Sequence, residues 1–179
     1  MARTGSGEER LVGEAEGCVI VGVSGSLASL AALRAGAEEA RRGGRRLVAV
    51  IAWEPPEGEA MYLRHPDRAW ALHWQGQARA RLDRAFESVF GGLPTGIGTV
   101  ERRVVRARPG RALCELAGHP DDLVVLGARP GRRRASRIHR HVTAHAGCAV
   151  LTVPAPAVPK GLRKALRRVT ADDFALVGR

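Results

Sequence analysis

The residues best suited to bind an anion lie between Leu123 and Gly147. An apolar run, Leu123–Leu126, is followed by Gly127 and then by a segment rich in arginine: Arg129, Arg132, Arg133, Arg134, Arg137 and Arg140. Glycine lets backbone amides approach a phosphate, the first turn of a helix offers unpaired amides, and guanidinium groups bind phosphate oxygens in pairs. The segment therefore indicates a candidate site for a phosphate-bearing ligand at the end of a strand.

Two other groups of residues have types that can do chemistry. Gly22-Val23-Ser24-Gly25-Ser26 approaches the G-x-S-x-G turn of serine hydrolases, but the fifth residue is serine and no Asp and His partners follow in a hydrolase context. We interpret Ser24 and Ser26 as turn and helix-cap residues. His139, His141 and His145 lie near one another in the sequence. No acidic residue has a spacing that would complete a metal site with them, and Cys148 is the one cysteine that could. We therefore expect no metal site and no catalytic residues.

The elements that must position these residues alternate between strand and helix. Continuous apolar runs and glycine or proline stops predict strands over 18–23, 47–53, 100–105, 123–126 and 149–153. Helical spacing predicts helices over 27–42, 66–90, 111–117 and 136–146, the first capped by Ser26 and ended by Gly43. Residues 54–65, with Pro55-Pro56, are predicted to be an irregular loop. Trp70 and Trp74 are expected to pack on the core or at an interface.

This alternation predicts an α/β fold with a single doubly wound, five-stranded parallel sheet and helices on both faces. Charged residues interrupt 100–105, so that strand is expected near an edge of the sheet. We expect three segments: a polar leader (1–16), the α/β domain (17–155) and a basic tail (156–179). The tail has apolar residues at Leu162, Leu166 and Val169, which predicts a short basic amphipathic helix.

Composition limits the classes of function. The chain has 179 residues and a formal charge of +11, but only two of its 29 basic residues are lysines, which is typical of a GC-rich genome and weakens a nucleic-acid interpretation. Aromatic residues make up 4%, too few for a base-stacking surface. Three dispersed cysteines argue against a disulfide framework. With no long uncharged apolar stretch and a polar leader, we expect no membrane span and a cytoplasmic location.

The order of these motifs resembles the universal stress protein family, over roughly residues 17–154. The residues that carry the resemblance are the first strand and turn (19–26), the fourth strand and loop (122–129), and the last helix end and strand (145–153). The resemblance implies an adenine nucleotide alpha hydrolase-like fold of the universal stress protein type and a homodimer formed through the fifth strand, Ala149–Val153. In the family's ATP-binding members the loop reads glycine, two residues, glycine, nine residues, then Gly-Ser or Gly-Thr.

The loop of this chain departs from that pattern. Gly127 matches the first glycine, Pro130 stands at the second with Gly131 one place later, and Ser136-Arg137 stand where Gly-Ser would be, about four residues early. Proline supplies no amide donor. The acidic residue that helps hold adenosine in ATP-binding members is replaced by Ser24. The expected remnant of the nucleotide site comprises Val23, Ser24, Gly127, Arg129, Gly131, Ser136 and Arg137.

These observations lead to three hypotheses of function. The first is a non-catalytic regulatory or stress-response protein whose ATP binding is weak or lost. The second is a stress sensor that binds ATP or another adenine nucleotide through arginines instead of glycine amides. The third is a basic adaptor for nucleic acid or an acidic partner, with the protein partner favoured over nucleic acid.

Overall fold

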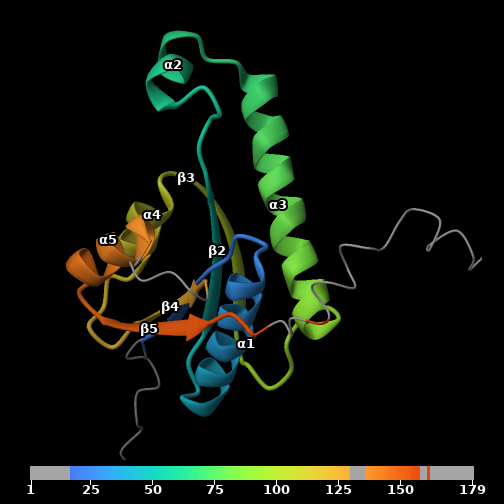
Figure 1. The fold of residues 1–179 in the computed structure, drawn as a ribbon, viewed down its shortest axis with the longest axis vertical. Coiled ribbons are helices and arrows are strands. Elements are labelled where there is room, and N and C mark those ends of the chain that lie inside the picture. The colour runs from blue at the N-terminus through green and yellow to red at the C-terminus, as the bar shows by residue number, and fades with distance from the viewer. Residues whose placement is uncertain (1–16, 130–135, 158–160, 162–179) are drawn as a thin grey trace, which may run out of the picture.

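One parallel sheet forms the centre of the molecule (Figure 1). In the computed structural model, which describes residues 17–129, 136–157 and 161, the strands are β1 (Val19–Gly22), β2 (Leu47–Trp53), β3 (Val100–Arg106), β4 (Leu123–Ala128) and β5 (Ala149–Pro154). Their order is β3-β2-β1-β4-β5, and every pairing is parallel. The strand order therefore changes direction at β1, between β2 and β4.

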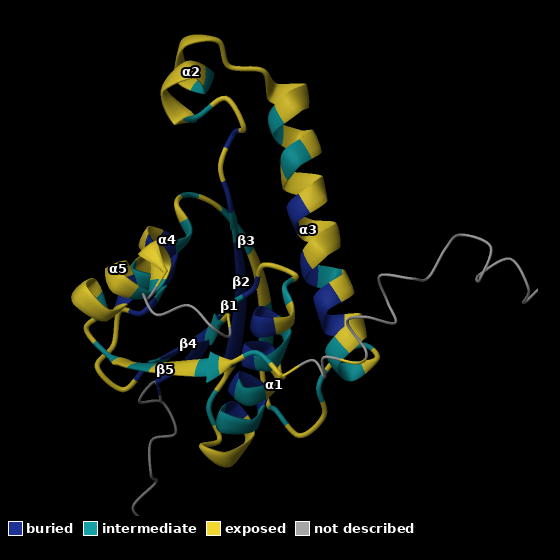
Figure 2. Ribbon diagram, viewed as in Figure 1, coloured by how far each residue is buried: buried dark blue, intermediate teal, exposed yellow. Residues whose placement is uncertain are grey.

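Two layers of helices cover the two faces of the sheet. Helices α1 (Leu27–Arg42) and α3 (Arg68–Phe90) pack on one face, and α4 (Pro109–Leu116) and α5 (Arg137–His145) pack on the other. Neither face of the central strands is left to solvent, as the dark blue sheet of Figure 2 shows. This explains why the central strands are apolar along their whole length instead of alternating with polar residues.

The core follows from the alternation of side chains along β1. Val19 and Val21 point to the layer of α1 and α3, whereas Ile20 points to the layer of α4 and α5, and all three are fully buried. Burying one such side chain stabilises the fold by roughly 1.5–3 kcal/mol. Gly36 in α1 fits closely against the sheet, because an added Cβ would lie 2.4 Å from a methyl group of Val21.

The predicted strands and long helices are present in the predicted order, and β3 lies at an edge as expected. The loop prediction for 54–65 is wrong in part, because α2 (Glu59–Arg64) is helical. None of its residues is buried. Arg106 of β3 holds it: the guanidinium lies 2.6 Å from Glu59 Oε1 and 3.9 Å from the ring centre of Tyr62. This tertiary contact leaves no periodic pattern in the sequence.

Helix α2 and the first turns of α3 stand apart from the rest of the molecule (Figure 1). Trp70 lies there and is 45% exposed, so it does not pack on the core of this chain. Its ring stacks on His73 with 5.5 Å between ring centres and meets Trp74 edge-on. The burial of α3 comes from its second half, where Ala78, Leu82 and Phe86 face the sheet.

The predicted leader (1–16) and nearly all of the predicted amphipathic tail helix lie outside the described residues. No helix in the described part of the chain is long and apolar enough to cross a membrane.

Candidate functional site

A cavity of about 170 Å³ opens at the carboxyl ends of β1, β2 and β4. We call it the strand-end cavity. Open parallel sheets bind ligands at this position, beside the strand at which the order changes direction. Its lining comes from β1 and the turn that follows, β2, β4 and all four long helices, and comprises Gly22, Val23, Ser24, Ser26, Ser29, Val50, Ile51, Ala52, Arg81, Pro109, Leu113, Leu126, Gly127, Ser136, Ile138 and His139.

A second hollow of about 220 Å³ lies between the later part of α1 and the segment after α3. Its charged residues include Arg41 and Glu38, which already form an ion pair with each other. The hollow is away from the carboxyl ends of the strands. The strand-end cavity is therefore the better candidate for a functional site.

Three serines shape the turn between β1 and α1. Ser26 caps α1 by accepting a hydrogen bond from the backbone N–H of Ser29 at 3.3 Å. Ser29 Oγ donates to the Ser26 carbonyl at 2.9 Å and accepts from the Ser24 N–H at 3.2 Å. Ser24 Oγ lies 3.1 Å from Ser26 Oγ. The hydroxyls thus hold the turn in place, as the cap interpretation of Ser26 predicts.

Gly127 at the end of β4 touches the first turn of α1. A Cβ added there would lie 2.1 Å from the carbonyl oxygen of Ala28 and 2.7 Å from the N–H nitrogen of Ser29. No side chain fits against that backbone, so close packing of strand on helix already requires a glycine. Gly127 also lines the strand-end cavity, but its identity does not by itself indicate a phosphate.

Ser136 and His139 form a pair at the start of α5. Ser136 is the N-cap, and its Oγ accepts from the His139 N–H at 3.3 Å. The same Oγ lies 2.9 Å from His139 Nδ1. The other ring nitrogen, Nε2, is buried and has no hydrogen-bond partner within 17–129 and 136–157. Burial lowers the pKa of His139, so its ring is neutral at neutral pH.

The sequence-predicted site residues separate into three groups. Val23, Ser24, Gly127 and Ser136 come together on the wall of the strand-end cavity. Arg129 and Arg137 are exposed and are not part of its wall. Gly131 lies outside the described residues.

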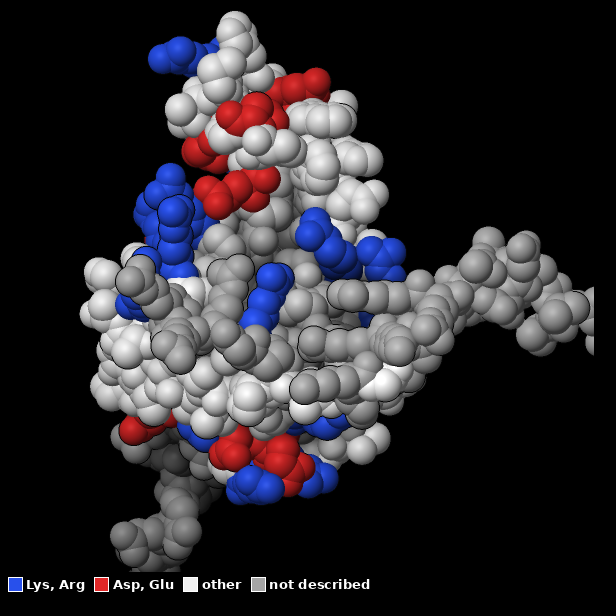
Figure 3. Space-filling view, viewed as in Figure 1, with Lys and Arg blue, Asp and Glu red and all other residues white. Residues whose placement is uncertain are grey.

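Two wall residues with titratable side chains were not predicted from the sequence to belong to this site. One is Arg81 of α3, whose position depends on how α3 docks, and no local pattern reports that. The other is His139, which the sequence suggested only as a metal ligand. The predicted helix over 136–146 placed His139 in its first turn, but no pattern in the sequence indicates that its ring faces the cavity. Figure 3 shows basic side chains on both sides of the middle of this face and acidic ones near α2.

The other two histidines of α5 do not join His139. His141 packs against Gly110 of α4, where an added Cβ would lie 2.8 Å from the imidazole ring. The rings of His141 and His145 stack with 4.4 Å between their centres, and His145 Nδ1 lies 2.8 Å from the His141 carbonyl. Within the described ranges, no three His, Cys, Asp or Glu side chains gather in a way that could hold a metal ion.

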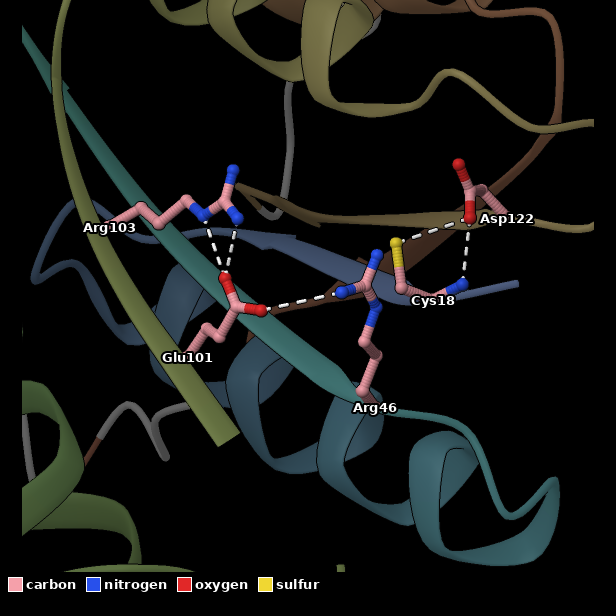
Figure 4. A network of polar contacts seen from close by, with 5 residues as sticks. All are labelled: Cys18, Arg46, Glu101, Arg103 and Asp122. Atoms are coloured by element: carbon pink, nitrogen blue, oxygen red, sulfur yellow. Dashed lines mark hydrogen bonds and ion pairs between the residues drawn. The ribbon is translucent and has the colours of Figure 1, made fainter. Parts of the chain in front are cut away.

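The amino ends of the strands carry a polar network that contains Cys18, Asp122, Arg46, Glu101 and Arg103 (Figure 4). We call it the amino-end network. Asp122 Oδ1 accepts from the Cys18 N–H at 2.7 Å and from its thiol at 3.2 Å, and Oδ2 accepts from the His119 N–H at 2.9 Å. Burial and the hydrogen bond to Asp122 raise the pKa of Cys18 to about 11. Cys18 is therefore an inert thiol and not a nucleophile.

Comparison with known proteins gives a consistent result. A family model described as "Universal stress protein family" matches residues 18–154. Among solved structures, a universal stress protein in complex with cAMP is 24% identical, covering 80% of this chain and 100% of that one with a TM-score of 0.50. UspA from Lactobacillus plantarum is 22% identical (79% and 99% covered, TM-score 0.53). The Archaeoglobus fulgidus protein in complex with dAMP is 17% identical (78% and 99% covered, TM-score 0.54). Comparison with curated proteins gives no match.

Proposed function

Since the chain belongs to the universal stress protein family, we propose that it is a non-catalytic regulatory protein of the stress response whose ATP binding is weak or lost. The observation that carries this proposal is the size of the strand-end cavity. At about 170 Å³ it is smaller than the roughly 300–1,000 Å³ of typical ligand sites. The cavity is too small to enclose a whole nucleoside triphosphate.

The start of α5 supports the proposal. The first turn of a helix can bind phosphate through its free amides. Here the Ser136 side chain takes the His139 amide, and Ile138 and His139 present bulky side chains to the cavity. The preceding loop contains Pro130, which has no amide hydrogen to offer.

A regulatory role without catalysis is supported by the state of the hydroxyls on the wall. Ser26, Ser29 and Ser136 are engaged in turn and cap hydrogen bonds. Ser24 is paired with Ser26. A hydroxyl acts as a nucleophile when an adjacent base takes its proton and a third group orients the base. Ser136 and His139 supply at most the first two parts of such an arrangement.

The second candidate function is an adenine nucleotide sensor. Two of the similar structures hold cAMP and dAMP, which carry one phosphate each. In this chain Arg81 on the cavity wall could meet a single phosphate, and the arginines of the loop after β4 could add charge from outside. This candidate keeps the site and changes how the phosphate is recognised.

We also propose that two chains pair through β5. This strand lies at the edge of the sheet and bonds only to β4 within the described chain. Leu151 on it is 36% exposed. A free parallel edge with apolar side chains is rarely left to solvent. Sedimentation analysis of wild type and Leu151→Glu checks this, because a monomeric wild type at micromolar concentration would contradict it.

Titration calorimetry with ATP tests the principal proposal. We expect no heat of binding at micromolar protein and ATP, and micromolar affinity would overturn the proposal. If binding is found, the triple substitution Arg129→Ala, Arg132→Ala and Arg134→Ala should abolish it under the second candidate. The matched control removes the same charge elsewhere, through Arg64→Ala, Arg68→Ala and Arg84→Ala. Equal affinity of both triple variants would contradict arginine recognition.

A further inference from the structure

Helix α2 and the first turns of α3, residues 54–74, form a lobe that contributes no residue to the strand-end cavity. Half of the large apolar side chains that are exposed in the described part of the chain belong to it: Met61 (49% exposed), Leu63 (68%), Trp70 (45%) and Leu72 (57%). Apolar exposure concentrated in one region marks an interaction surface. The lobe is therefore a candidate docking surface.

Contacts within the chain hold the lobe in one position before any partner binds. Arg106 of β3 forms an ion pair with Glu59 and lies over the ring of Tyr62. The side chain of Asp67 caps α3 by accepting a hydrogen bond from the Trp70 N–H at 3.0 Å. A preformed surface loses little conformational entropy when a partner binds, so even modest contacts can hold one.

The lobe differs in charge from the rest of the chain, and Figure 3 shows acidic side chains near α2. It has four carboxylates and two guanidinium groups, a net charge of −2: Glu54, Glu57, Glu59, Asp67, Arg64 and Arg68. The whole chain has a net charge of +11. Two copies of the lobe repel each other, and so do the lobe and an anionic lipid surface. The surface fits a basic partner that also offers apolar side chains.

The tail of this chain has that chemistry. Residues 160–169 contain five basic residues and no acidic one. In the predicted helix, Leu162, Leu166 and Val169 share one face, and the basic side chains cover the rest. The tail therefore complements the lobe both in charge and in its apolar face.

The fold starts the tail within reach of the lobe. Strands β2 and β5 are parallel, so the lobe and the tail both leave the carboxyl edge of the sheet. Three strand spacings separate β2 from β5, roughly 14 Å before the twist of the sheet is added. Residues 155–160 reach about 17 Å when extended, and the predicted helix over 160–169 adds about 15 Å. Such a tether keeps the tail at a high effective concentration, which favours docking within one chain.

We propose that the lobe is the docking surface for the basic tail of the same chain. Leu162 and Leu166 pack against the exposed apolar side chains of the lobe, and the basic face of the tail lies toward its carboxylates. Glu54 and Glu57 are both exposed and can receive these cations. The strand-end cavity takes no part, so the proposal is independent of nucleotide binding.

Zero-length carbodiimide cross-linking of the full chain tests the proposal, because Lys160 and Lys164 are the only lysines in the sequence. The reagent joins a carboxylate to an amine that touches it. Mass spectrometry should find Lys160 or Lys164 joined to Glu54, Glu57 or Asp67, in a product with the mass of one chain. Lysine cross-links confined to carboxylates outside the lobe, cross-links between two chains, or no lysine cross-link would overturn the proposal.

A matched pair of variants tests the apolar part of the contact. Leu63 in the lobe and Leu93 outside it are 68% and 61% exposed, so neither substitution to serine should unfold the protein. Leu63→Ser should lower the yield of the tail-to-lobe cross-link about threefold, and Leu93→Ser should leave it unchanged. Salt at about 0.5 M should lower the yield in wild type, because it screens exposed charges. Equal yields from the two variants, or a yield that salt does not change, would contradict the proposal.

Discussion

At the amino ends of β1 and β4, Asp122 accepts hydrogen bonds from two backbone amides and a thiol, and each of its oxygens has a partner. At the carboxyl ends of the same strands, His139 Nε2 is buried without a partner in the described chain. Both groups are polar and shielded from water. The amino-end network satisfies its buried acceptor from within the fold, whereas the strand-end cavity has a buried ring nitrogen with no partner in the described chain.

The difference supports a role in stability for the amino-end network and fits the recognition role that we propose for the strand-end cavity. A buried polar group whose hydrogen bonds are complete holds two segments in one relative position, here the starts of β1 and β4, which are 104 residues apart. A buried polar group that the fold does not satisfy costs stability. Substitution of Asp122 should therefore cost more stability than substitution of the groups around His139.

The largest loss of stability is expected from Asp122→Ala. The substitution leaves the amides of Cys18 and His119 without their acceptor, so the free energy of unfolding should fall by about 3 kcal/mol. Urea denaturation measures it. The adjacent Asp121→Ala is the matched control, because its side chain is 79% exposed, and it should change stability by less than about 0.5 kcal/mol. Equal losses in both variants would contradict the role of the Asp122 hydrogen bonds in stability.

The same comparison can be made against pH. Burial acts to raise the pKa of Asp122, but hydrogen bonds from the Cys18 and His119 amides outweigh it and lower the pKa. The unfolded chain therefore binds the proton more readily, and the contribution to stability is fully present above the ordinary value of 3.8. It is lost as pH falls through the folded-state value. The difference between wild type and Asp122→Ala should narrow below pH 3.8, and a constant difference would contradict the role of the charge.

The next largest effect is expected from Gly127→Ala at the carboxyl end of β4. The new Cβ collides with the Ala28 backbone, which cannot turn aside as a side chain could, so the free energy of unfolding should fall by about 2 kcal/mol. Gly147→Ala serves as control, since nothing lies within 4 Å of its added Cβ. Thermal and urea unfolding without ligand check the prediction. Unchanged stability would contradict the packing requirement for glycine at position 127 and would leave only a role in ligand binding.

Much of the fold was predictable because its signals are local. Strand β2 and helix α1 begin and end where an apolar run, the Ser26 cap and Gly43 predict. Helix α2 was not predictable, because a contact with Arg106, far along the chain, holds it. Trp70 was expected at the core or at an interface, since its spacing matches the buried face of α3. It does not pack on the core, because the first turns of α3 extend past the sheet, and the interface alternative stays a prediction.

The site was predictable only where it lies at the end of a strand or the start of a helix. Motif positions brought Val23, Ser24, Gly127 and Ser136 to one cavity, although their ligand role stays a prediction. The position of Arg81 depends on the docking of α3, and the pairing of His139 depends on a side-chain rotamer. Neither leaves a pattern in the sequence that could be read in advance.

The smallest loss of stability is expected from Ser136→Ala. Removing this cap should cost about 1 kcal/mol, well below the loss expected at Asp122. It also removes the hydroxyl that lies 2.9 Å from His139 Nδ1, so the ring signals of His139 in ¹⁵N-histidine spectra should shift. Ser136→Thr keeps the hydroxyl and should behave as wild type in both measurements. If Ser136→Ala lowers stability while the ring signals of His139 stay unchanged, the serine is only a helix cap, and the two ends of the sheet differ less than their hydrogen bonds indicate.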